Sequence, residues 1–240
     1  MKRIALIAIG LCTAFGSATA RAHDFWIEPG SYHPSPGERV QLTLRVGENF
    51  EGDPLPRMTF RIQSFVIRDA NGERAVPGIE NMSPAGIALV AKMPAVIGYR
   101  SNFDQVEMPR DKFESHLRKE GLDNRITVRS DGVQKERFAR FAKTFLGPVD
   151  TKPLGWRLEI VPASAGQFRV VYESKPLAGT LVFALSREGK QLSARTDAKG
   201  LVSFDLGAGE WLVKTVHMIP ADASTGVAWE SMWASVTFTK

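Results

Sequence analysis

The chain has 240 residues, with 31 Lys and Arg, 26 Asp and Glu, a formal net charge of +5 and a single cysteine. This length is enough for one large or two small domains, and one cysteine excludes an internal disulfide framework and a cysteine-based zinc site. Three of the basic residues lie within the first 22, so the excess charge does not point to a nucleic-acid partner.

The first 22 residues have the order of a secretory signal peptide. A basic start is followed by the apolar run 4–15 and then by small residues. The run is too short for a permanent membrane span, and no later segment is longer. Cleavage after Ala20 or after Ala22 satisfies the small-x-small rule and removes Cys12. We therefore expect a periplasmic or secreted protein with no membrane span, no thiol, no nucleic-acid partner and a net charge of +2.

Short alternating runs separated by turn clusters dominate the next part of the chain. The clearest are 39–46 (RVQLTLRV), 59–69 (TFRIQSFVIRD) and 86–93 (GIALVAKM). Alternation with a period of two between Gly and Pro predicts antiparallel strands. The pattern is typical of a β-sandwich and not of a βαβ fold.

The middle of the chain changes its pattern. Residues 109–122 and 134–146 carry apolar residues at helical spacing, with Pro109 before the first segment and Gly121 after its last turn. We predict two short helices here, the second docking its phenylalanines on the core. The Gly- and Pro-containing stretch 147–155 reads as a linker.

From Trp156 onward the alternation resumes in a compact all-β module with Gly-containing turns. The prediction is therefore a mainly β protein made of two β-sandwich domains, immunoglobulin-like or transthyretin-like, with one or two short helices between them. The predicted domains are 23–153, which includes the helical insertion, and 154–240, following a signal peptide over 1–22.

His23 falls at the predicted cleavage site. A cut after Ala22 would add a free α-amine, with an ordinary pKa of about 8, to its imidazole. With one further histidine this gives three nitrogens in a T-shaped plane, a histidine brace that suits Cu(II) and also Ni(II). A cut after Ala20 would instead let the amine, two amides and the imidazole form a square-planar cage. The alternative without metal is that His23 opens the first strand beside Phe25 and Trp26.

Three other histidines could complete a brace. His33 lies in a turn before a proline and His116 on a predicted helix, and we expect both to be solvated. His217 ends the apolar strand WLVKTVHM ahead of a loop of small residues, a position suited to a metal ligand. Its alternative role is to cap the strand edge through hydrogen bonds.

The last strand contains a carboxylate flanked by tryptophans. Glu230 and Trp229 could lie beside the metal and hold its ligands in place by hydrogen bonding. The alternative is that Glu230 pairs with a cation while Trp229 and Trp233 pack in the core.

Four segments in order resemble the bacterial domain-of-unknown-function 4198 family. They are AHDFWIEPGSYHPSPGERVQLTLRVGENFEGDP, KFESHLRKEGL, PLAG with TDAKG, and GEWLVKTVHM with WESMWASVTF. The resemblance covers essentially the whole chain after residue 22. It implies a tandem β-sandwich protein of the periplasm, related to components of nickel and cobalt uptake systems. It also implies that His23 matches the leading histidine of the family, and that His217 matches the histidine of its late strand.

Three functions follow from these features. The leading hypothesis is a metal-binding protein that holds Cu(II), Ni(II) or Co(II) through His23 and His217, and buffers it or delivers it to a membrane transporter component. The second is a copper-dependent histidine-brace oxidase. The third is an adhesive or carbohydrate-binding double sandwich in which His23 does no chemistry.

Overall fold

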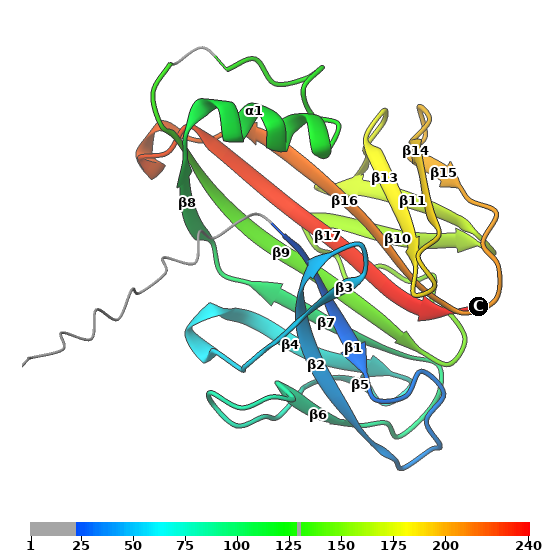
Figure 1. The fold of residues 1–240 in the computed structure, drawn as a ribbon. Helices are drawn as coiled ribbons and strands as arrows, with labels where there is room; N and C mark the ends of the chain where they lie inside the picture. The colour runs from blue at the N-terminus through cyan, green and yellow to red at the C-terminus, as the bar shows by residue number, and fades with distance from the viewer. Residues whose placement is uncertain (1–22, 129–130) are drawn as a thin grey trace, which may run out of the picture.

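A computed structural model describes residues 23–128 and 131–240. The predicted signal peptide and its two cleavage sites lie outside the described residues. The described chain is mainly β, as predicted, with one α-helix, α1 (Arg110–Lys119), and two short 3-10 turns, η1 (Thr59–Arg61) and η2 (Ala223–Thr225). Figure 1 shows three sheets, with α1 lying across one end of the largest.

The largest sheet has nine strands and runs through the middle of the molecule (Figure 1). In spatial order its strands are β14 (Gln191–Arg195), β13 (Leu181–Ser186), β16 (Glu210–Pro220), β17 (Trp229–Thr239), β9 (Gln134–Leu146), β7 (Ala95–Ser101), β4 (Ile62–Asp69) and β5 (Gly72–Ala75). The ninth strand, β8 (Asp104–Met108), pairs with the first part of β9. The pairs are antiparallel except for β17 with β9, which is parallel.

Two smaller sheets cover the two faces of this central sheet. One contains β1 (Asp24–Pro29), β2 (Arg39–Glu48), β3 (Glu51–Leu55) and β6 (Gly86–Leu89). The other contains β10 (Leu158–Ser164), β11 (Gln167–Tyr172), β12 (Lys175–Pro176) and β15 (Leu201–Ser203). Each smaller sheet buries a separate hydrophobic core against the central sheet. β9 contributes to both cores, because successive side chains of a strand point to opposite faces. Phe141 belongs to the core under β10, and its neighbour Ala142 belongs to the core under β1.

The predicted helix over 134–146 is wrong, because this segment forms β9. Its side chains are buried on both faces of the sheet, so apolar residues occupy adjacent positions such as Phe145 and Leu146. A run that is apolar on both faces has no clean period of two and mimics helical spacing. The other predicted helix is present as α1, and the three early runs contain β2, β4 and β6 within somewhat different bounds.

The predicted domain boundary at residues 153 and 154 falls in the loop between β9 and β10. The central sheet crosses that boundary, because β17 from the second segment pairs with β9 from the first over nine residue pairs. None of the described helices is long and apolar enough to cross a membrane.

Candidate functional site at the start of the first strand

His23 lies immediately before β1 and is held from two directions. Its carbonyl oxygen accepts a hydrogen bond from Nη1 of Arg140 in β9, at 2.9 Å. Its Nδ1 lies 3.3 Å from Oε1 of Glu48, the last residue of β2, and has no well-formed hydrogen bond to any described residue. The side chain is 30% exposed. The Nδ1 side of the ring therefore faces the Glu48 carboxylate, and the rest of the ring remains accessible to solvent.

Glu48 is shared between His23 and a lysine at the end of α1. Nζ of Lys119 donates to the same Oε1 at 2.6 Å. The hydrogen bond from Lys119 holds the pKa of Glu48 below its usual range against the opposing effect of burial, and the charge of Lys119 lowers this pKa further. The carboxylate is therefore ionised at neutral pH and supplies a negative charge beside the His23 ring.

The next residue, Asp24, anchors the start of β1 in a buried charge cluster. It pairs with the ammonium of Lys214 in β16, and Nζ of Lys214 also lies 3.5 Å from Oε2 of Glu120 at the end of α1. Burial by itself lowers the pKa of Lys214, but the two carboxylates outweigh it and raise that pKa. Burial raises the pKa of Glu120. This cluster ties β1, β16 and α1 together, so the backbone around His23 is well fixed.

A pocket of about 450 Å³ opens beside His23. Its walls are mostly apolar and aromatic, with the guanidinium groups of Arg61 and Arg140 among them. Phe60 and Phe103 line the same pocket with 70% and 43% of their surface exposed. The size and the mixture of apolar walls with a few polar groups are typical of small-molecule sites.

Arg140 is the most distinctive cation of this pocket. Its guanidinium lies 5.1 Å from the ring centre of Phe25 and 5.4 Å from that of Phe138. No carboxylate of the described residues lies within ion-pair distance of it. Burial lowers the pKa of Arg140 to about 10, so the group stays charged at neutral pH. It can therefore hold an anionic or hydrogen-bond-accepting group in the pocket next to His23.

The structure does not bring His217 to His23. Lys214 and Val216 of β16 point toward β1 and α1, so His217 points to the opposite face of the central sheet. There its ring lies 4.5 Å from that of Tyr172 in β11. Burial lowers the pKa of His217 to about 4, and the charge of Arg125 adds to this effect. The geometry of the described residues therefore does not favour a brace made by His23 and His217 together.

Glu230 and Trp229 also lie away from His23. Glu230 is buried and forms ion pairs with Arg137 and Arg157, which is the alternative that the sequence had left open. Arg157 in turn contacts Tyr172, which links Glu230 to the surroundings of His217. Trp229 stacks on Phe113 beneath α1, at a ring distance of 5.9 Å.

The two remaining histidines behave differently from each other. His33 is exposed, as expected, and its Nε2 lies 2.7 Å from Oγ1 of Thr239. His116 is not solvated as predicted, because it packs against Trp233 at a ring distance of 5.4 Å. Its Nε2 is buried without a hydrogen bond to any described residue. Helical position alone could not show that this side of α1 faces the sheet.

Within residues 23–128 and 131–240, no group of three or more His, Cys, Asp and Glu side chains is arranged to hold a metal ion. The residues brought together at His23 were only partly visible in the sequence. Glu48 stands in a cluster of acidic residues, but nothing local pairs it with a histidine 25 positions earlier. Arg140 and Lys214 lie in β9 and β16, and the order of strands in the sheet determines which residues they meet. The sequence alone therefore did not place them near His23.

The comparisons with known proteins give one match. A family model described as a domain of unknown function, DUF4198, matches residues 20–219. No curated protein and no solved structure matches the chain.

Proposed function

The chain belongs to the DUF4198 family of unknown function, and we propose that its exported form, periplasmic or secreted, binds a divalent transition-metal ion at His23. Cu(II) is the first candidate, and Ni(II) and Co(II) are the others. The protein would buffer the ion or deliver it to a membrane transporter component.

The observation that supports this proposal is the placement of Nδ1 of His23 opposite Oε1 of Glu48, at 3.3 Å. Two ligand atoms that each bind one ion at about 2.0–2.1 Å lie about 3.3 Å apart at a tetrahedral angle and about 2.9 Å apart at the right angle of a square-planar Cu(II) or Ni(II) ion, so a planar ion would draw the Glu48 carboxylate closer by about 0.4 Å. A buried ring nitrogen without a well-formed hydrogen bond also gains a partner when a metal binds. The spacing and the donor types therefore fit one ion between the two residues.

A third ligand would come from the chain terminus. Cleavage before His23 creates a free α-amine, and the amine and Nδ1 of the same histidine can chelate one ion. The amine has an ordinary pKa of about 8, so it loses its proton to a metal readily near neutral pH. Two nitrogens with one carboxylate suit Cu(II), and Ni(II) follows it closely in the usual affinity order. The hydrogen bond from Arg140 to the His23 carbonyl restrains the backbone that carries this amine.

Glu48 thus takes the place that the sequence suggested for His217, as the ligand from a distant part of the chain. Lys119 competes for it, since its ammonium already lies 2.6 Å from the oxygen that the metal would take. Lys119 is about half exposed, and its flexible side chain can swing into solvent. We expect Lys119→Met to tighten metal binding and Glu48→Gln to weaken it.

Calorimetric titration with Cu(II) tests the site on protein that begins at His23. Retaining Ala22 before His23, or making Glu48→Gln, should weaken binding by about 10-fold or more, because each change removes a ligand or its charge. His217→Ala is the matched control and should bind as tightly as the unaltered protein. Equal affinities for the protein with and without Ala22 would overturn the proposal.

The intact mass of the exported protein identifies its first residue. A mass beginning at His23 supports the amine-imidazole chelate. A mass beginning at Arg21 favours the self-contained terminal cage, whose affinity should not depend on Glu48.

The aromatic pocket beside His23 favours a second candidate, a copper-dependent oxidase. Exposed Phe60 and Phe103 provide a surface on which an organic substrate could lie next to the metal. Copper-loaded protein supplied with dioxygen and an external reductant would then reduce the dioxygen by two electrons and two protons to hydrogen peroxide. If no peroxide forms, the oxidase candidate is excluded and metal binding alone remains as the proposed function.

A further inference from the structure

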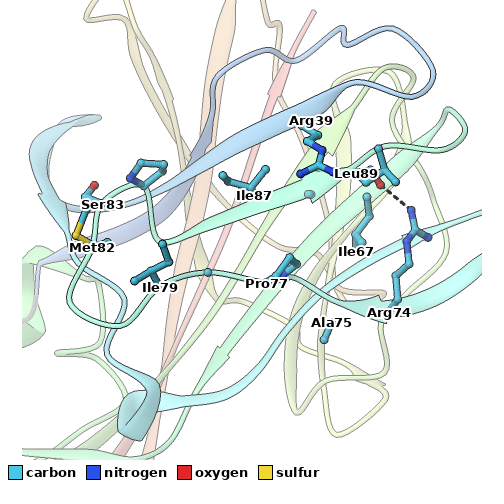
Figure 2. Close-up of a pocket in the computed structure, with 13 residues that line it drawn as sticks. Arg39, Ile67, Arg74, Ala75, Pro77, Ile79, Met82, Ser83, Ile87 and Leu89 are labelled. Carbon is cyan, nitrogen blue, oxygen red and sulfur yellow. Dashed lines mark hydrogen bonds between the residues drawn. The ribbon is translucent and has the colours of Figure 1, made fainter.

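A second pocket, of about 630 Å³, lies between β5, β6 and the loop that connects them (Figure 2). It shares no lining residue with the pocket beside His23. Its volume falls within the range of sites that bind small organic molecules. The pocket therefore calls for an explanation separate from the metal proposal.

The lining is unusually apolar for a surface exposed to water. Among the described residues, seven large hydrophobic side chains are exposed, and four of them line this pocket. These are Ile79, Met82, Ile87 and Leu89, with 71%, 52%, 40% and 48% of their surface exposed. Apolar side chains gathered at one hollow, and not scattered singly, are typical of a binding surface.

The charged side chains that line the pocket have one sign. Arg39 and Arg74 line it, and no Asp or Glu does. Arg74 is already neutralised by Asp69, through hydrogen bonds of 2.9 and 2.8 Å, and donates to the carbonyl of Leu89. Arg39 is exposed and has no ion pair with any described residue. The free positive charge of the pocket is therefore that of Arg39.

Figure 2 shows how these groups are distributed along the pocket. Arg39, Arg74 and Leu89 lie toward one end, whereas Ile79 and Met82 lie toward the other, with Ile87 in between. The hollow therefore has one cationic end and a mostly apolar remainder, with Ser83 beside Met82 at the far end.

We propose that this pocket binds an amphiphile that has a single carboxylate and an unbranched alkyl chain. The carboxylate pairs with Arg39, whose planar guanidinium matches carboxylate geometry. The alkyl chain lies along Ile87 toward Ile79 and Met82 and covers apolar surface that otherwise contacts water. The pairing at one end and the burial along the rest fix the orientation of the ligand.

Titration with alkanoates below their micelle concentration tests the proposal. From octanoate to dodecanoate, we expect affinity to rise about fourfold per methylene, which corresponds to about 0.8 kcal/mol. Dodecyltrimethylammonium carries the same chain with a cationic head, and it should bind at least 10-fold more weakly than dodecanoate. Equal binding of the two would overturn the assigned role of Arg39.

Two variants with matched controls separate the head from the chain. Arg39→Gln should weaken dodecanoate at least fivefold, whereas Arg169→Gln, at an exposed arginine of β11, should not. Ile79→Ser should weaken both amphiphiles, whereas Val133→Ser, at an exposed apolar residue outside both pockets, should weaken neither.

Other outcomes would contradict the proposal. Absence of dodecanoate binding, or binding that neither Arg39→Gln nor Ile79→Ser changes, excludes this site. Concentration-dependent dimerisation that Ile79→Ser abolishes would show that a second copy of the chain covers the apolar surface instead.

Discussion

Burial determines the ionisation of two side chains near the contact between α1 and the central sheet, His116 of α1 and Glu136 of β9. Burial lowers the pKa of His116 to about 4, and the charges of Lys119 and Lys214 add to this effect. Burial raises the pKa of Glu136 to about 7, although a hydrogen bond from Ser231 opposes the rise. Both groups favour their neutral form in the folded protein, because each lies in or beside the apolar contact between α1 and the central sheet. Their effects on the pH dependence of stability have opposite signs.

His116 should make the protein less stable in mild acid. In the unfolded chain it titrates near 6.5, so between pH 6.5 and 4 the unfolded state binds more protons than the folded state. The free energy of unfolding therefore falls as the pH is lowered, by roughly 2 kcal/mol from this residue between pH 7.5 and 5. His116→Phe keeps a ring against Trp233 and should remove this part of the slope, as measured by urea unfolding at several pH values.

Phe113→Leu is the matched control for that measurement, since it lies on the same helix and does not titrate. It should lower the free energy of unfolding by about 1 kcal/mol at every pH. Glu136 is present in all of these proteins, so its opposing contribution cancels when slopes are compared. A slope in His116→Phe equal to that of the unaltered protein would contradict the buried neutral imidazole.

At the scale of elements, β9 joins the two halves of the chain through both its faces. One face packs under β1, and the other carries Lys143 toward β10. Nζ of Lys143 lies 2.8 Å from Oε1 of Glu159, and both side chains are almost fully buried. The Glu159 carboxylate also accepts hydrogen bonds from three backbone amides of the β9–β10 loop. The pair therefore fixes the loop as well as the contact between the sheets.

Lys143→Met should lower the free energy of unfolding by about 3–5 kcal/mol, because it leaves the buried Glu159 without its counter-ion. Lys135→Met is the matched control on the same strand. Its pair with Glu107, at 2.9 Å, is about half exposed on both sides, and its loss should cost less than about 1 kcal/mol. Denaturant unfolding measures both, and equal costs would show that burial of the first pair has no energetic consequence.

At the scale of the whole molecule, the central sheet joins the two predicted domains, because β17 of the second pairs with β9 of the first. The cores on its two faces both include side chains from β7 and β9. The last strand, β17, receives further hydrogen-bonded contacts from β1, because Ser235 and Thr237 donate to the carbonyl groups of Phe25 and Ile27. Neither segment can lose its fold without exposing the apolar face of the other.

We therefore expect the amides of β9 and β17 to open together. In native-state hydrogen exchange, the slowest amides of both strands should report the same free energy of opening, because opening either strand breaks the nine-pair ladder that it shares with the other. Independent sandwiches would instead give two values, one for residues 23–153 and another for 154–240. That result would contradict a shared cooperative unit.

Much of the fold was predictable because strand patterns are local. Alternation around residues 39–46 reflects one buried and one more open face. β16 and β17 are buried on both faces, and the turns that bound their apolar runs indicated strands there. These strands were identified correctly. The segment 134–146 was predicted as a helix because its strand is covered on both faces. The sequence also drew attention to His23, but it suggested His217 as its partner, whereas the strand register places Glu48 beside it.

The sequence by itself determined the mainly β character, the helix at α1 and the family of this protein. Only the tertiary structure decided which distant side chains meet. A side chain's face on a strand follows from its position in the alternation, but its neighbour follows from the order of strands in the sheet. For this reason Glu48, Arg140 and the apolar pocket near Arg39 emerge only once β1, β9 and β6 are in place. His217 lies away from the His23 site for the same reason. It follows Val216 directly in β16, so its side chain points to the opposite face of the central sheet.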